Sequence, residues 1–430
     1  MRLRLNSLTA LLGLCLGCLP ALAADEDAAL DLQIDEKPVA EAAVSGVAAP
    51  AQSGRLSVEM SIGGLEHRFR GETVDTHRVS IDFRRVWVLE PGWRFGISDR
   101  LDQQSVVDNG DRATLNSLRE AYVSWLQSVD APWAVDIGRL QLRNGPAYGF
   151  NPTDYFRRGS LRTLTTADPI ALRENRLGTV VLRAQKLWPD SALSMALAPK
   201  LGDYPSNASF SLDLGSTNAQ NRMLVTWSQR LNERLSGQFL WLGERGAAPQ
   251  WGASATALVG DAVVAFAEWS GGKRNNLLGE LAGHSAPTRW RNQVATGATV
   301  SLPAQLAVTL ELDYNGAAPS RAEWLQAMTT TPTLLGQYLG AAASAQDSAS
   351  RRAWMFYVTQ KSVLLNKLDL TVLWRRNQDD RSWFTWVELR HHWRNADLAL
   401  QWQRAEGKQA SEYGALSGRQ SLQLVGTWFF

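Results

Sequence analysis

LAVTLELDY, at residues 306–314, alternates without a break between apolar and polar side chains. In an extended strand one face would carry Leu306, Val308, Leu310, Leu312 and Tyr314. The other face would carry Ala307, Thr309, Glu311 and Asp313. The same alternation recurs around Phe95, Val225 and Leu400. The pattern predicts an all-β chain whose strands are about ten residues long.

Working outward from this stretch, eighteen such segments can be placed along the chain. We predict strands at 55–63, 76–87, 92–102, 117–127, 132–139, 176–186, 191–199, 220–230, 234–243, 250–259, 261–270, 290–301, 304–314, 351–361, 366–376, 381–393, 395–404 and 419–430. A count of 16 is also compatible with the pattern, since single-strand signals are weak.

The connections between these segments separate a membrane barrel from a soluble β-sandwich. Tight turns such as Leu302-Pro303 and Asn395-Ala396 alternate with longer loops along the chain. Short periplasmic turns, long extracellular loops and an even number of strands are typical of a transmembrane antiparallel β-barrel. The sequence therefore predicts a barrel with an apolar face toward lipid and a polar face toward a wet lumen.

Tryptophan usage and the N-terminus support a location in the bacterial outer membrane. The chain has 18 Trp, the residue that marks both rims of membrane barrels. Arg2, Arg4, an apolar run at 8–19 and Ala21-Leu22-Ala23 are typical of a signal peptide. Its run is too short for a spanning helix, and no later stretch approaches the roughly 18 apolar residues that one needs. We expect a signal peptide at 1–23, an acidic disordered periplasmic tail at 24–54 and the barrel at 55–430.

Composition and motifs argue against several other classes of protein. Cys15 and Cys18, the only cysteines, fall in the predicted signal, so we expect neither disulfides nor a metal site or cofactor. Without Arg2 and Arg4, 42 basic residues balance 42 acidic ones, which disfavours nucleic acid as a partner. About thirty residues before the first strand are too few for the plug domain of a TonB-dependent transporter. No nucleophile elbow, zinc-protease motif or P-loop occurs, and we expect no enzyme.

The last predicted strand places Leu422, Leu424, Trp428 and Phe430 on one face. This segment resembles the C-terminal assembly signal of outer-membrane proteins, which implies that the barrel-assembly machinery reads Leu424, Trp428 and Phe430. Outer-membrane lipid and lipopolysaccharide are the other expected partners. For the acidic tail we keep open a periplasmic partner, a mobile stopper in the lumen and plain disorder.

The segment after the fifth predicted strand is rich in arginine. Eight arginines lie between residues 139 and 183, with only three acids. Arginine presents a rigid fork of donors that suits carboxylate, phosphate or sulfate groups. If this loop folds into the lumen, it would form an anion-attracting constriction. The predicted solute-binding residues are Arg139, Arg143, Arg157, Arg158, Arg162, Arg173, Arg176, Arg183, Arg94 and Arg222.

Two plainer roles for these arginines remain open at this point. They could pair with lumenal acids, of which Asp136, Glu268, Glu311, Asp313, Asp369 and Glu388 are the candidates. They could also contact lipopolysaccharide phosphates outside the barrel. The Asn151-Pro152-Thr153-Asp154 run has turn chemistry in each case, so we expect an ordered loop.

The run from Gly138-Arg139 to Gly149-Phe150-Asn151-Pro152-Thr153-Asp154 resembles a segment of proteobacterial outer-membrane barrels of porin type. The eighteen-strand plan with an Arg-rich lumen is similar to the alginate-export porin family. The second likeness implies passage of a polyanion, and with it polysaccharide export.

A second long loop, 315–350, begins with a capping box at Ser320-Arg321-Ala322-Glu323 and predicts a helix there, with another over 334–345. We keep open a lid or plug helix and a plain surface helix.

The functional hypotheses are an outer-membrane channel or porin for a hydrophilic, anionic solute or polysaccharide, and, as the alternative, a barrel enzyme using His392 or an envelope-assembly component without conduction.

Overall fold

The computed structural model describes residues 54–105, 114–127, 132–206, 208–281, 288–330 and 332–430. The predicted signal peptide and nearly all of the predicted tail lie outside these ranges. Eighteen strands follow one another: β1 (Gly54–His67), β2 (Thr73–Glu90), β3 (Trp93–Gln104), β4 (Thr114–Leu126), β5 (Trp133–Leu140), β6 (Thr179–Trp188), β7 (Ser191–Ala198), β8 (Arg222–Asn232), β9 (Leu235–Glu244), β10 (Gln250–Val259), β11 (Val263–Arg274), β12 (Arg289–Leu302), β13 (Leu306–Asn315), β14 (Arg352–Gln360), β15 (Leu368–Asn377), β16 (Trp383–His392), β17 (Ala396–Glu406) and β18 (Gly418–Phe429).

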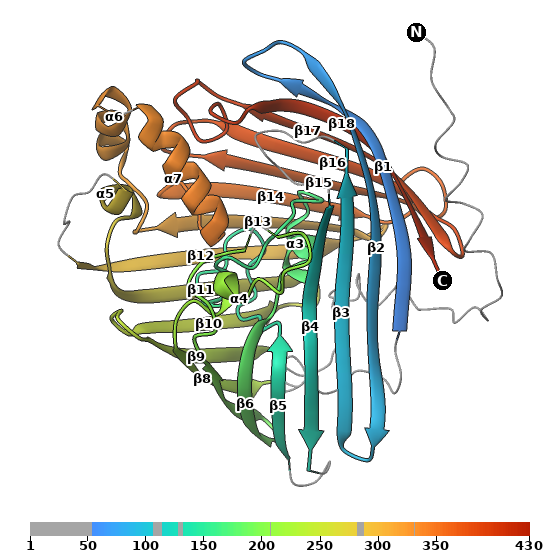
Figure 1. The fold of residues 1–430 in the computed structure, drawn as a ribbon, viewed down its shortest axis with the longest axis vertical. Coiled ribbons are helices and arrows are strands. Elements are labelled where there is room, and N and C mark those ends of the chain that lie inside the picture. Colours follow the sequence, from blue (N-terminus) through green and yellow to red (C-terminus); the bar gives the residue numbers. More distant parts are fainter. Residues whose placement is uncertain (1–53, 106–113, 128–131, 207, 282–287, 331) are drawn as a thin grey trace.

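Every strand pairs antiparallel with its neighbours in the chain, and β1 pairs with both β2 and β18. The sheet therefore closes on itself and leaves no free edge (Figure 1). The seam runs from Ser57 opposite Phe429 to His67 opposite Gly418, and the amide of Phe430 donates to the carbonyl of Leu56 at 2.9 Å. The predicted barrel of eighteen antiparallel strands is confirmed.

The two ends of the barrel carry different connections. At the end where β1 begins and β18 ends, the connections are 91–92, 127–132, 189–190, 233–234, 260–262, 303–305, 361–367 and 393–395. We call this the short-turn end. At the opposite, long-loop end, 141–178 and 316–351 are the longest connections. That the short-turn end faces the periplasm stays a prediction.

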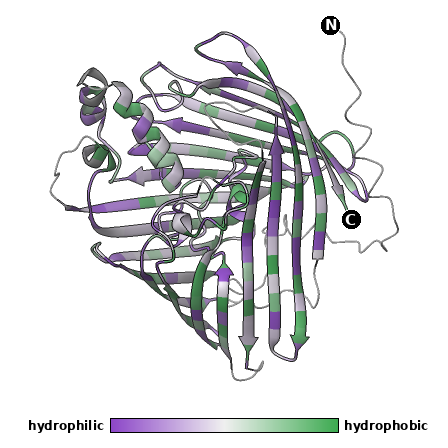
Figure 2. Ribbon diagram, viewed as in Figure 1, coloured by the Kyte–Doolittle hydropathy of each residue, from purple (hydrophilic) through white to green (hydrophobic). Residues whose placement is uncertain are grey.

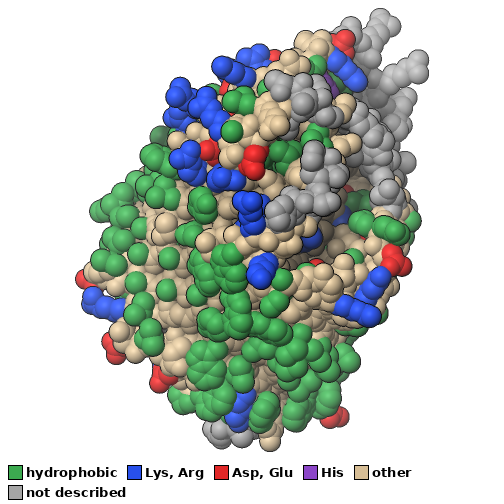
Figure 3. Space-filling model, turned by 90° about the vertical axis from the view of Figure 1, so that its left-hand side faces the viewer, with side chains coloured by type: hydrophobic (Ala, Val, Ile, Leu, Met, Phe, Trp, Pro, Cys, Tyr) green, Lys and Arg blue, Asp and Glu red, His purple; other side chains and the backbone are tan. Residues whose placement is uncertain are grey.

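The alternation predicted for residues 306–314 is present in β13. Leu310, Leu312 and Tyr314 are exposed on the outer wall, whereas Glu311 and Asp313 between them are buried in the barrel interior. Figure 2 shows the same alternation of hydropathy along many strands. In Figure 3 apolar side chains cover much of the outer wall, while Lys and Arg gather toward its upper end.

Tryptophans form a ring at each end of the outer wall. The ring at the short-turn end includes Trp93, Trp125, Trp133, Trp188 and Trp428, all at or next to strand ends. The ring at the long-loop end includes Trp251, Trp290, Trp354, Trp374 and Trp383. Such rings are typical of membrane barrels, because the amphipathic indole prefers the interface between lipid and water.

Among the residues that the structure describes, five short helices interrupt the loops at the long-loop end: α3 (Pro169–Glu174), α4 (Leu214–Thr217), α5 (Leu277–Leu281), α6 (Arg321–Thr330) and α7 (Pro332–Ala345). The capping box predicted for α6 is present, since Ser320 and Glu323 exchange hydrogen bonds between side chain and backbone. None of the helices in the described part of the chain is long and apolar enough to cross a membrane.

The exposed outer face leads to a prediction about lipid contact. Arginine in place of Leu310, near the middle of β13, would place a charge at the bilayer midplane and cost about 2–4 kcal/mol. Arginine in place of Leu302, at the strand end by the short-turn rim, should cost about 0–1 kcal/mol. Reversible unfolding in phospholipid vesicles measures both values. Equal costs would mean that β13 does not face lipid.

Candidate functional site: a loop that crosses the barrel

The connection between β5 and β6, residues 141–178, folds into the barrel instead of staying at its rim (Figure 1). We call it the crossing loop. It contacts β11 through Glu268, β13 through Glu311 and β14 through Tyr357, on the far side of the barrel from its own strands. Residues 150–157 are buried without exception. The loop is an ordered internal element, as its turn-rich sequence predicts.

Glu311 anchors the tip of the crossing loop to the barrel wall. Its side chain accepts hydrogen bonds from the amides of Tyr148, Gly149 and Phe150, at 2.7, 2.9 and 2.9 Å. The residue is fully buried, with 0% of its surface exposed. Three backbone amides converge on one buried side chain that would be costly to bury without partners, so this contact is a major attachment of the loop.

Glu268 provides a second anchor next to the first. Its carboxylate accepts from the amide of Ala147 at 2.6 Å and from the Thr153 hydroxyl at 2.8 Å. The side chain of Asn151 spans the same turn, donating to the carbonyl of Ala147 and, at 3.5 Å, to Glu268. The Gly-Phe-Asn-Pro-Thr-Asp motif is therefore a turn shaped to surround a carboxylate on the opposite wall.

Small residues make room for this contact. Ala295 and Gly297 on β12 lie between the two glutamates, opposite Glu268 and Glu311 in the sheet register. Phe150 from the loop packs there with Phe266 and Ala295. In the loop itself Gly145 has φ +81°, and a Cβ atom there would lie 2.2 Å from Glu268 Oε1. A larger residue at position 145 would collide with the anchor.

Of the eight predicted arginines between residues 139 and 183, six stabilise the crossing loop or the wall beside it. Arg139 donates to the carbonyls of Gly178 and Leu212, and Arg183 pairs with Asp136 at 2.8 Å. The others are Arg157, Arg162, Arg173 and Arg176, each paired with a carboxylate. They act as cross-links within the folded loops.

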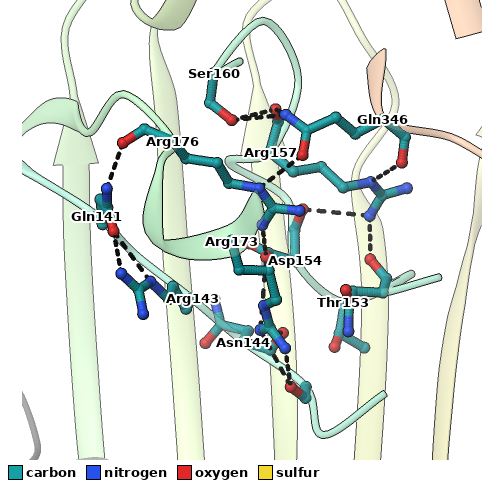
Figure 4. Close-up of polar contacts among 12 residues, drawn as sticks. Gln141, Arg143, Asn144, Thr153, Asp154, Arg157, Ser160, Arg173, Arg176 and Gln346 are labelled. Atoms are coloured by element: carbon teal, nitrogen blue, oxygen red, sulfur yellow. Dashed lines mark hydrogen bonds and ion pairs between the residues drawn. The ribbon is translucent and has the colours of Figure 1, made fainter. Parts of the chain in front are cut away.

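Asp154 and Gln346 are the centres of this network (Figure 4). The buried Asp154 carboxylate contacts Arg176 at 2.5 Å and Arg173 at 3.7 Å. Gln346, from the loop after α7, accepts from Arg176 Nε at 2.6 Å and donates to the carbonyl of Arg157 at 2.6 Å. Burial, only partly offset by Asp154, lowers the pKa of Arg176 to about 10, which leaves it charged at neutral pH.

Asp347 completes the link between the two long loops by pairing with Arg157. Burial opposes ionisation of Asp347, but Arg157 and Arg274 outweigh it and hold its pKa below the ordinary range. The amide of Gly159 also donates to the carbonyl of Ser344, at the end of α7, at 2.9 Å. The helix predicted at 334–345 is thus present as α7, and its C-terminal end is attached to the crossing loop.

Arg143 and Arg158 differ from the other six because both residues are exposed. Arg143 hydrogen-bonds only to Gln141 Oε1, and no ion pair or hydrogen bond involves the Arg158 side chain within the described residues. The charge of Arg158 acts on Arg222 and Arg274, at the long-loop ends of β8 and β11. The charges that act on Arg143 are those of Glu174 and Arg173 in the crossing loop and of Glu120 and Arg84, which each lie six residues from the short-turn end of their strand.

The structure places Arg94 and Arg222 on the inner wall near opposite ends of the barrel. Arg222 lies 4.4 Å from the ring centroid of Phe156 and donates to the carbonyl of Thr217. Arg274, Gln346 and Asp347 belong to the same region, and the sequence analysis did not select them. Their only local signal is a charged or amide side chain at the end of a strand or helix.

The suggested pairing of loop arginines with lumenal acids is correct for Arg183 and Asp136 but wrong for Glu268 and Glu311. These two glutamates accept hydrogen bonds from backbone amides instead, because a glycine-containing turn brings several N–H groups to one side chain. Of the other acids, Asp313 pairs with Arg375 and Glu388 with Arg390.

His392, the candidate base of a barrel enzyme, lies between two carboxylates. Its Nδ1 is 2.9 Å from Asp397, and its Nε2 is 3.4 Å from Asp369. With a carboxylate at each ring nitrogen, neither nitrogen is in place to activate a serine hydroxyl. The arrangement is that of an ion-paired histidine near the short-turn end.

Comparisons with known proteins bear on the fold. No protein-family model and no curated protein matches the sequence. Among solved structures, a BenF-like porin from Pseudomonas fluorescens Pf-5 superposes with a TM-score of 0.55 at 9% identity, covering 89% of this chain and 99% of that one. The outer-membrane protein opdK from Pseudomonas aeruginosa gives 0.53 at 12% identity, covering 88% and 99%. OccK2 (OpdF) from Pseudomonas aeruginosa, in complex with glucuronate, gives 0.54 at 11% identity, covering 88% and 98%.

The chain thus has the fold of the bacterial outer-membrane porins, and the predicted porin-type barrel of the outer membrane is confirmed. The likeness to alginate-export porins stays a prediction.

The first anchor can be tested with Glu311→Gln. The amide keeps the shape but has one acceptor oxygen in place of two, so the backbone amides lose an acceptor, which costs about 1–3 kcal/mol. Exchange of the amide hydrogens at 148–150, followed by mass spectrometry, should become roughly ten- to hundred-fold faster. Glu388→Gln is the control, since Glu388 bonds Arg390 and Gln401 and not the loop tip. Unchanged exchange in Glu311→Gln would contradict the anchoring role.

Gly145→Ala tests how tightly the loop fits against the second anchor. Gly246 is a matched control, because it has a similar φ of +85° but nothing within 4 Å of an added Cβ. Gly246→Ala should cost only the backbone strain, roughly 1–2 kcal/mol. Gly145→Ala should cost clearly more and expose the loop to protease cleavage. The same loss of unfolding free energy in both variants would show that the loop does not press on Glu268.

Proposed function

We propose that this protein is an outer-membrane channel for small hydrophilic anions, with the crossing loop as its selective barrier. The observation that carries the proposal is the exposure of Arg143 and Arg158 on a loop whose other arginines are used in cross-links. A cation that is not neutralised by a partner is available to a passing solute. Rings of arginine or lysine select for anions in pores on the same principle.

On the long-loop side Arg158 lies among more cations than anions. Three further arginines share its surroundings: Arg157, Arg222 and Arg274. The carboxylates there are Asp347 and, beside Arg222, Glu244. This side therefore has a positive excess where a solute from the long-loop end would first meet the crossing loop. The excess raises the local concentration of anions.

On the short-turn side a second set of arginines continues the path. Arg84 lies opposite Arg55 in the register of β1 and β2. Its side chain is 55% exposed and forms a long ion pair with Glu120, at 3.9 Å. Arg94 is the second residue of β3, next to the short-turn rim. Arg143 interacts with Arg84 of this set and with Arg173 of the crossing loop, beside the carboxylates of Glu174 and Glu120. We propose that an anion passes from the cations around Arg158 to Arg143 and then to this set.

The chemistry of the path favours a carboxylate-bearing solute of modest size. Arginine binds a carboxylate with two parallel hydrogen bonds, which holds the solute in register without trapping it covalently. The neighbouring fold of OccK2 was solved with glucuronate, a sugar acid of this kind. Export of a whole polysaccharide remains a prediction from the earlier resemblance, and no contact in the described residues favours it over small anions.

The alternative of an enzyme or an assembly component without conduction lacks a supporting site. His392 has carboxylates at both ring nitrogens. No cluster of three or more metal-ligating side chains occurs within the described ranges. Planar-bilayer recording separates the hypotheses, because only a channel gives current.

The double variant Arg143→Gln, Arg158→Gln tests the anion preference. Two unpaired positive charges leave the path, each worth about 1 kcal/mol to an anion at 4 Å even in water. We expect the ratio of anion to cation permeability, from reversal potentials in a salt gradient, to fall about five-fold or more.

Arg234→Gln, Arg245→Gln is the matched control. It removes the same net charge from exposed hairpins at the two rims, away from the crossing loop. The proposal fails if the control lowers the permeability ratio as much as the test variant, or if the wild-type barrel prefers cations.

A further inference from the structure

The connection 361–367, between β14 and β15, exposes two adjacent leucines at the short-turn end. Leu364 is 81% exposed and Leu365 is 64% exposed. The connection is also the longest at that end, where most others have two or three residues. Two neighbouring leucines in water are unfavourable, and a well-formed turn that presents them indicates a binding surface.

The turn is held in shape by its own hydrogen bonds. The amide of Ser362 donates to Asp369 at 2.9 Å, and the amide of Val363 donates to the carbonyl of Leu368 at 2.8 Å. Ser362 and Lys367 take up left-handed backbone conformations, with φ of 53° and 65°. These contacts fix the backbone on both sides of the leucines, so their exposure is built into the turn.

The next hairpin, 393–395, lies beside this turn. The amide of His392 donates to the carbonyl of Lys367 at 2.9 Å, which joins the two connections. Trp393 is 52% exposed, with its ring 4.3 Å from the ring of His391. Trp393 extends the tryptophan ring at the short-turn end, so the exposed leucines lie at the level where lipid headgroups meet water.

The two connections carry three cations and no acid. Lys361, Lys367 and Arg394 form no ion pair within the described residues. Two other cations of the same rim have a carboxylate nearby: Arg230 pairs with Asp190, and Arg234 lies 3.8 Å from Asp261. The turns that expose Leu364, Leu365 and Trp393 differ from those hairpins in their positive excess.

We propose that these residues form a binding site for a phospholipid with an anionic headgroup, with Lys361, Lys367 and Arg394 around the phosphate. Leu364, Leu365 and Trp393 would cover the upper part of the acyl chains. Apolar side chains flanked by cations, next to an interfacial tryptophan, match the chemistry of an anionic membrane surface. Two leucines and one tryptophan are small beside the roughly 1,200–2,000 Å² that a specific protein partner buries, which favours lipid as the occupant.

The full-length barrel in detergent micelles provides the test. Short-chain phosphatidylglycerol or phosphatidylcholine is added in steps, and the thermal unfolding midpoint is recorded. The anionic lipid should raise the midpoint of the wild type at lower concentration than the zwitterionic lipid. In Lys367→Gln, Arg394→Gln the half-effective concentration of the anionic lipid should rise about five-fold or more. Leu364→Ser, Leu365→Ser should weaken the response to both lipids.

Arg230→Gln, Arg234→Gln is the control, because it removes the same charge from the same rim where each arginine already has a carboxylate nearby. This control should respond like the wild type. If it loses the response as fully as the test variant, the effect is general electrostatics and the site is wrong. If the leucine variant keeps the full response, the leucines do not contact the lipid, and the lipid proposal is overturned. None of these outcomes depends on whether the barrel conducts anions.

Discussion

Two buried carboxylates, Glu268 and Glu311, determine how the interior of this barrel is organised. A closed barrel of eighteen strands is wide enough for a water-filled lumen, so its chemistry depends on what fills the lumen. Each glutamate would be costly to bury without partners. The backbone amides of residues 147–150 and the Thr153 hydroxyl satisfy them, and the crossing loop is thereby held to the opposite wall.

Once the loop is fixed in this way, the roles of its arginines separate. Arg157 pairs with Asp347, and Arg176 contacts Asp154 and Gln346, so both side chains help to join the two long loops. Arg143 and Arg158 are exposed and form no ion pair within the described residues, although Glu174 and Glu120 act on Arg143 and Asp347 lies near Arg158. Whether a loop arginine forms a cross-link or stays exposed is thus a matter of position along one loop, and it follows from where the anchors hold that loop.

The fold could be predicted from the sequence because its signals are local. The period of two in β13, the tight turns and the aromatic strand ends each involve residues close together in the chain, and the strands lie close to their predicted places. The predicted strand 176–186 started too early: β6 begins at Thr179, and Arg176 belongs to the loop. The amides of Leu177 and Gly178 donate to the carbonyls of Ser160 and Arg119, and periodicity does not reveal such contacts.

The site could be predicted only in part, because its decisive contacts join distant residues. Glu311 lies 163 positions from Tyr148, and nothing near Glu311 shows that its partners are backbone amides and not arginines. The sequence also could not show that Gln346 sits between Arg157 and Arg176. That contact has a mechanical consequence: α7 packs with Leu278 of α5 through Tyr338, and its end is tied to the crossing loop through Gln346 and Asp347. A displacement of α7 at the long-loop end must therefore move or break the contacts next to Arg158, so the crossing loop and the loop that carries α7 are one mechanical unit.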